Sequence, residues 1–180
     1  MENSILSCII FLVAFLLGCK DSGVEPQPET EYYWAGGDKI VLNINYKTVI
    51  GVYHPDSTHP KQSFEILYFD SPQKKSLHSI MIDRGFDPDL FEWISFGYTY
   101  NEREVLPTNR ISFHLKIGYT FNNLQQLIQD EAVFDSTNFG TVMLKVAKQD
   151  GNVFKIANKV QESGFVEYSL PDFIANITYY

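Results

Sequence analysis

The stretch RISFHLKIGYTFNNLQQLI, residues 110–128, decides the fold because its apolar period changes in the middle. Its first half alternates as a half-buried strand does, with apolar side chains at Ile111, Phe113, Leu115 and Ile117. Thr120 is placed to cap a helix. The helix that follows has apolar residues three and four positions apart, at Phe121, Leu124, Leu127 and Ile128. The stretch therefore predicts a strand, a short connection and an amphipathic helix.

The same change of period returns further along the chain. After a short extended piece at residues 132–135 and a turn at 136–138, a second strand alternates at Val142, Leu144 and Val146. Asp150 or Asn152 caps a second helix, whose buried stripe consists of Val153, Ile156, Ala157 and Val160.

Gly164 is expected to end the second helix, and residues 165–169 to form the last strand. The resulting order is β-α-β-β-α-β. This order predicts a ferredoxin-like module over residues 108–180, with four strands on one face and both helices on the other.

Residues 32–107 have period two and no long helical period. One strand alternates at Ile40, Leu42, Ile44 and Tyr46. Further strands are expected at residues 48–53, 63–69, 77–82 and 93–100. Turn-rich pieces such as HPDSTHP and DSPQKK separate them. We therefore predict a small antiparallel β module ahead of the ferredoxin-like one, and an α+β fold class for the whole chain.

The start of the chain carries a processing signal. Residues 5–17 form a charge-free apolar run that is short for a bilayer span and suits a signal-peptide core. The run ends in Leu-Leu-Gly-Cys at residues 16–19, which resembles a bacterial lipobox. The resemblance implies that residues 1–18 are a lipoprotein signal peptide, cleaved before Cys19, whose thiol is then acylated. A plain secretory signal or a buried first helix is the alternative, since the leading MENS lacks the usual basic residue.

Residues 19–31 are polar with two prolines and are expected to be a flexible tether. The expected localisation is the cell envelope, as an outer-membrane lipoprotein. Lys20-Asp21 resembles the surface-export signal of Bacteroidetes lipoproteins and favours exposure at the cell surface. The formal charge of −8 disfavours nucleic acid and anionic lipid, so the acyl group alone would contact the membrane.

Two longer segments carry a family resemblance. They are VLPTNRISFHLKIGYTFNNLQQLI, residues 105–128, and FGTVMLKVAKQDGNVFKIANKVQESGFVEYSLPDF, residues 139–173. Together they resemble the N-terminal prodomain of Bacteroidetes subtilisin-like (S8) serine proteases, and YYWAGGDKIVLNIN at residues 32–45 resembles how extended prodomains begin. The sequence stops at Tyr180, where a protease would begin, so the resemblance is to a prodomain standing alone.

The resemblance implies a function in trans as an inhibitor or folding chaperone of a subtilisin-like protease, which is the expected partner. The sheet would pack on the enzyme, with Glu167 and Asp172 as the protease-facing carboxylates. The C-terminal tail would lie in the substrate cleft as a bound product, through Ile177, Thr178, Tyr179 and Tyr180. The alternative is a tail that frays or packs back onto the sheet.

Two other functions stay open. The chain could be a surface module that binds a peptide, glycan or partner protein, which an exposed cluster of Tyr32, Tyr33, Trp34 and Trp93 would favour. It could also be a non-catalytic remnant of an S8 protease.

No catalytic group emerges from the sequence, and we expect no enzyme and no cofactor. Asp21-Ser22-Gly23 looks like a subtilisin aspartate motif, yet the matching His and Ser motifs are missing. His54 and His59 could be two loop metal ligands, but a zinc site needs three or four. The acidic cluster lacks the spacing of a calcium loop, and a solvated turn is expected for Asp83, Asp87, Asp89 and Glu92.

Overall fold

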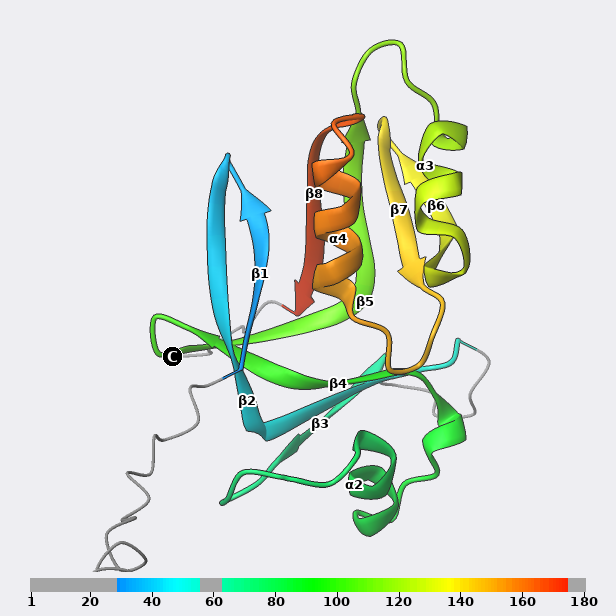
Figure 1. The fold of residues 1–180 in the computed structure, drawn as a ribbon. Coiled ribbons are helices and arrows are strands. Elements are labelled where there is room, and N and C mark those ends of the chain that lie inside the picture. The colour runs from blue at the N-terminus through cyan, green and yellow to red at the C-terminus, as the bar shows by residue number, and fades with distance from the viewer. Residues whose placement is uncertain (1–28, 56–62, 175–180) are drawn as a thin grey trace, which may run out of the picture.

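The fold is that of a computed structural model, which describes residues 29–55 and 63–174 of the chain. Every strand pairing among these residues is antiparallel, and three helices accompany the sheet (Figure 1). The predicted α+β class is therefore confirmed. The strands are β1 Thr30–Ala35, β2 Asp38–Tyr53, β3 Phe64–Tyr68, β4 Phe91–Tyr100, β5 Arg103–Leu115, β6 Ala132–Asn138, β7 Thr141–Val146 and β8 Val166–Ile174. The α-helices are α2 Leu77–Asp83, α3 Phe121–Ile128 and α4 Val153–Glu162, and the 3-10 turns are η1 Pro88–Leu90 and η2 Gln129–Glu131.

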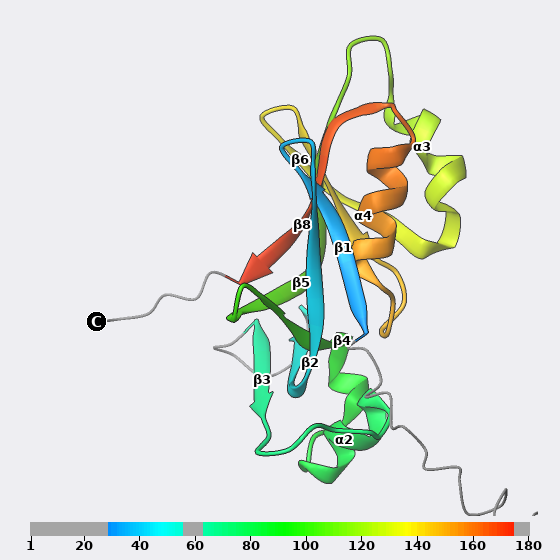
Figure 2. The same ribbon diagram turned by 60° about the vertical axis from the view of Figure 1, so that its left-hand side comes forward.

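Strand β5 connects the two halves of the sheet. Its first residues pair with β4, residues 106–115 pair with β8, and residues 110–114 pair with β7 as well. The pairing path runs β1-β2-β4-β5-β7-β6, with β3 added on β2 and β8 on β5. In the second half, the spatial order is therefore β8-β5-β7-β6, and α3 and α4 lie together on one side of these four strands (Figure 2).

Both helices of the second half begin as their sequences predict. Thr120 is the N-cap of α3, and its backbone N–H donates to Asn123 Oδ1 at 2.9 Å. Asn152 rather than Asp150 caps α4, because its Oδ1 accepts from the backbone N–H of Lys155 at 2.9 Å. The predicted apolar stripes face the sheet, and the fully buried members are Leu124, Ile128, Val153, Ile156, Ala157 and Val160.

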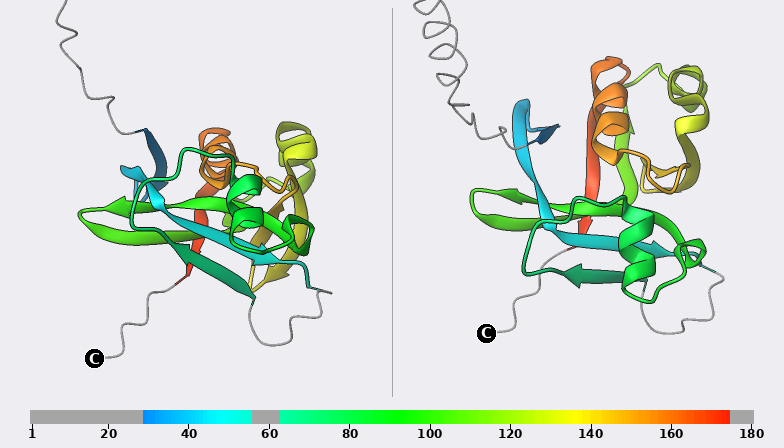
Figure 3. Two further views of the ribbon diagram at one scale, coloured as in Figure 1. Left: turned by 90° about the horizontal axis from the view of Figure 1, so that it is seen from below. Right: turned by 60° about the horizontal axis from the view of Figure 1, so that its bottom comes forward.

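The predicted strand at residues 77–82 is wrong, because these residues form helix α2. Ser76 caps the helix, accepting from the backbone N–H of Ser79 at 3.3 Å. Ile80 and Met81 are buried, three and four residues after Leu77, which is the helical spacing. They belong to a second, smaller core between α2 and strands β2, β3 and β4. This part lies at the lower end of the molecule in Figure 1, and the views of Figure 3 bring it toward the viewer.

Several strand limits also differ from the prediction. The two strands expected at 40–46 and 48–53 are one strand, β2, with a register shift between Asn45 and Val49. The turn expected at residues 136–138 lies at Phe139 and Gly140 instead, because β6 continues to Asn138. Ile117 lies beyond the end of β5 and is 99% exposed, because the chain has already left the sheet there.

The main hydrophobic core contains side chains from both predicted modules, before and after residue 107. One cluster joins Leu42, Trp93 and Leu106 to Phe113 and the buried stripe of α4. The β1–β2 hairpin is held against α4 by the side chain of Asn158, whose Nδ2 donates to the carbonyl oxygen of Tyr32 at 2.7 Å. That residues 32–107 and 108–180 are separate modules thus stays a prediction. In the folded chain, side chains from the two parts pack together in one core.

Candidate functional site

The candidate site is the side of the second-half sheet that faces away from the helices. Phe113 is buried beneath α3 and α4, and neighbouring residues on a strand point to opposite faces. Ser112 and His114 therefore point to the other face, together with the residues that pair with them on β7 and β8. We call this set the open face, and it consists of Ser112, His114, Thr141, Met143, Tyr168 and Leu170.

The open face is partly exposed and carries few charges. The ring of Tyr168 is stacked on His114 with centroids 6.3 Å apart, and its hydroxyl lies 3.2 Å from Thr141 Oγ1. Charged side chains gather at one end of the face, where Arg110 and Lys145 pair with carboxylates. A low charge density with tyrosine and methionine at the centre is typical of the middle of a protein–protein interface.

The two predicted protease-facing carboxylates both lie on β8. Glu167 is at a register shift, which brings its Oε2 within 3.2 Å of His114 Nδ1 while the side chain stays 54% exposed. Asp172 is exposed, with Oδ2 3.5 Å from Thr108 Oγ1. Both carboxylates are thus accessible from the strand that borders the open face.

The lipidation site Cys19 and the tail residues 177–180 lie outside the described residues. Strand β8 itself runs five residues further than predicted, to Ile174, because Leu106 and Pro107 of β5 pair with its last two residues. Figure 2 shows that the end of β8 turns to the side away from α3 and α4. The described chain therefore ends on the side of the open face.

The exposed cluster of four aromatic residues that would favour a surface-binding module does not form. Trp93 is 1% exposed, and its Nε1 donates to the carbonyl of Gly151 at 2.8 Å. Tyr33 packs inward against Phe154 and Phe173.

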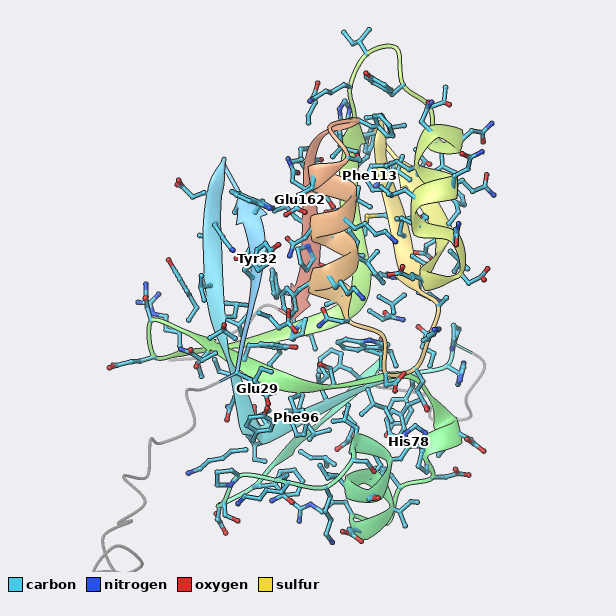
Figure 4. All side chains as sticks on the ribbon, in the orientation of Figure 1. Glu29, Tyr32, His78, Phe96, Phe113 and Glu162 are labelled. Atoms are coloured by element: carbon cyan, nitrogen blue, oxygen red, sulfur yellow. The ribbon has the colours of Figure 1, made fainter. Side chains whose placement is uncertain are left out.

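Tyr32 and Trp34 are the two that reach the surface, because they alternate with Tyr33 along β1. Tyr32 Oη and Trp34 Nε1 both donate to Glu162 Oε1, at 3.2 and 3.1 Å. Figure 4 labels Tyr32 on β1 and Glu162 on α4. The hydrogen bond to Glu162 raises the pKa of Tyr32, with smaller contributions from desolvation and the negative charge.

Three acidic residues of the predicted cluster, Asp83, Asp87 and Glu92, have separate partners. Asp83 pairs with Lys75, and Asp87 caps η1 by accepting from the backbone N–H of Asp89 at 3.0 Å. Glu92 accepts from Asn109 Nδ2 at 2.8 Å and Lys145 Nζ at 2.9 Å. No group of three potential metal-ligating side chains gathers within residues 29–55 and 63–174.

The histidines do not form a metal site among these residues. His54 is exposed, and His59 lies outside the described part. His78 lies on α2 rather than on a strand.

The contacts Glu92–Lys145 and His114–Glu167 were not predicted from the sequence. Both join residues far apart in the sequence. Lysine and histidine at outward strand positions were the available signal, but their partners depend on which strands become neighbours.

No family model, curated protein or solved structure matches the chain. Among the described residues, none of the helices has the length and apolar character needed to cross a membrane.

Proposed function

We propose that this chain is a non-catalytic protein-binding module of the cell envelope that inhibits a subtilisin-like serine protease in trans or assists its folding. We further propose that the module predicted at residues 108–180 is ferredoxin-like. The strand order β8-β5-β7-β6 and the position of both helices on one side support this classification.

The observation that carries the proposal is the open face. Its four strands are covered by helices on one side only, and its centre consists of uncharged, partly exposed side chains. Strand β8 borders this face and ends on the same side, so one partner can contact the face and the chain that follows β8.

In the proposed complex, Glu167 and Asp172 face positive helix N-termini of the enzyme. The tail adds a strand to the substrate cleft, where backbone hydrogen bonds supply affinity and alternate side chains supply specificity. Ile177 and Tyr180 occupy apolar pockets. Burying one such side chain stabilises a complex by about 1.5–3 kcal/mol, so losing both weakens binding by roughly a hundredfold or more.

The test measures inhibition of purified subtilisin-like proteases by three variants of the full chain. Deletion of residues 177–180 and Met143→Arg, at the centre of the open face, should each abolish inhibition. Val41→Arg is the control, since Val41 is 49% exposed on β2 in the first half. The proposal fails if the wild type inhibits none of the enzymes, or if both test variants inhibit as well as the control. A tail deletion that unfolds the protein would show that the tail belongs to the fold.

The proposed localisation has its own test. Cys19→Ser should move the protein from the membrane fraction to the soluble fraction, because it removes the acylated thiol. Recovery of the unaltered protein entirely in the soluble fraction would contradict acylation.

A second candidate function, binding of a glycan or peptide at the surface, rests on Tyr32, Trp34 and Glu162. Two aromatic rings and a carboxylate lie together here, with Lys39 Nζ 3.8 Å from the Tyr32 ring centre. Trp34→Ala should then remove binding on a glycan array without affecting protease inhibition. Retention of every array signal by this variant would exclude the second function.

A further inference from the structure

Strand β6 is one of four strands that pair with a single neighbour among the described residues; the others are β1, β3 and β8. A strand of this kind presents unpaired backbone N–H and C=O groups, which can pair with another chain. Soluble proteins usually protect such edges with lysine, proline, charge or a bulge.

Strand β6 exposes apolar side chains on both of its faces. Val133 is 51% exposed and pairs with Lys145, whose side chain lies on the same side of the sheet as the open face. Phe134 is 52% exposed and lies on the helix side, where its ring contacts Phe121 at 5.7 Å. Another strand placed along β6 would cover both residues.

The edge of β6 is also electrically neutral. Its one charged residue is Asp135, whose Oδ2 lies 3.3 Å from Arg110 Nε. The other three edge strands each carry at least one carboxylate: Glu31 on β1, Glu65 on β3, and Glu167 and Asp172 on β8. No lysine or arginine pairs with these four within residues 29–55 and 63–174.

Of the four edge strands, β6 is therefore the one whose charge least opposes contact between identical chains. A chain with a formal charge of −8 repels its copies, and two acidic edges brought together would add to the repulsion. At β6, Arg110 of each copy already neutralises the charge of Asp135 in the same copy.

We propose that two copies of this chain associate through β6, with the two strands antiparallel about a twofold axis. An antiparallel pair of identical strands is self-complementary, so one edge supplies both halves of the interface. The register shift between Phe134 and Ser136 bends the strand, so the shared ladder is short and Val133 and Phe134 supply much of the contact. Because β8 is the opposite end of the order β8-β5-β7-β6, the dimer leaves β8 free.

The first experiment is sedimentation velocity of the full chain over a concentration series. All samples carry Cys8→Ser and Cys19→Ser and contain the same non-ionic detergent, so that residues 5–17 behave alike throughout. The test variant is Val133→Glu, since Val133 is 51% exposed and lies opposite Lys145, whose positive charge is near enough to offset a carboxylate there besides Glu92. The control is Val41→Glu, because Val41 is also a strand valine and is 49% exposed.

We expect the wild type and the control to dimerise equally, and Val133→Glu to weaken the dimer by about tenfold or more. A wild type that is monomeric at every concentration overturns the proposal, as does a Val133→Glu variant that dimerises like the control. Circular dichroism of each variant checks that the fold is retained.

The second experiment does not depend on a charged substitution. Phe134→Cys places a thiol on β6 near the proposed twofold axis, at a side chain that is 52% exposed, and Tyr68→Cys places one on the edge strand β3, where the native side chain is 57% exposed. Under mild oxidation, only the first should form a disulfide-linked dimer rapidly. Equal rates for the two variants would mean random collision and would overturn the proposal.

Discussion

Phe154 of α4 offers the sharpest test of how the chain folds, because its ring contacts three strands from both sides of residue 107. It is 0% exposed and lies 6.1 Å from Tyr33 of β1, 4.7 Å from Tyr98 of β4 and 6.1 Å from Phe173 of β8. Phe154→Ala would leave a cavity at the point where these elements meet. Such replacements cost about 3–5 kcal/mol, and the lost aromatic pairs favour the upper half of that range.

The assay is thermal unfolding followed by calorimetry and circular dichroism. For a domain of this size, 1 kcal/mol shifts the Tm by about 2–4 °C, so the Tm should fall by roughly 6–20 °C. The matched control is Phe139→Ala, the same change at a ring that is 99% exposed, which should change stability by less than about 0.5 kcal/mol.

Both variants should unfold in a single transition, because the core that contains Phe154 extends across residue 107. Two transitions, of which only one moves in Phe154→Ala, would refute the inference of a shared core and support independent folding of residues 32–107 and 108–180. A shift no larger than that of the control would refute the estimate of its packing energy.

Three further predictions concern single groups. Phe139 has a positive φ of 47° ahead of Gly140, so Phe139→Asn should stabilise the fold by about 1 kcal/mol in urea denaturation, and a loss of stability would contradict this. Gly51→Ala should destabilise by about 1–3 kcal/mol, measured in the same way, because its Cβ would lie 2.5 Å from the ring of Phe91; unchanged stability would show that the ring moves aside. Burial raises the pKa of Tyr98 from 10.0 to about 12, and a hydrogen bond to Glu29 raises that of Tyr46 to about 12. The folded state holds these two phenolic protons more tightly than the unfolded state, so both tyrosines contribute to the stability of the fold below pH 10 and lose that contribution as the pH rises to 12. Alkaline absorbance titration and unfolding curves should show the two late titrations and the loss of stability. Titration of all tyrosines near pH 10 would exclude the prediction.

The second half of the fold could be predicted because its period changes are strong and its caps are local. Thr120 and Asn152 lie one residue before α3 and α4, and both helices have continuous apolar stripes. Helix α2 was missed because seven residues give too few turns to distinguish helical spacing from alternation. The register shift in β2 was missed since the pairing with β4 decides it.

The site could be predicted less well than the fold. Glu167 and Asp172 were chosen as carboxylates near the outward surface of the sheet, and both are exposed. Alternation along β1 already implied that Tyr33 faces away from Tyr32 and Trp34, but Trp93 gave no such signal. Its burial depends on a hydrogen bond to Gly151, a residue far along the chain.

The position of β8 affects the order in which the protein can fold as it is made. The ribosome produces β8 after every other described strand, yet β8 pairs along most of β5, from Leu106 to Leu115. Until it emerges, one side of β5 has no partner strand and Phe173 cannot join the ring of Phe154. A nascent chain therefore cannot complete its sheet before β8 has emerged from the ribosome, so this domain should be most prone to misassembly while β8 is still missing.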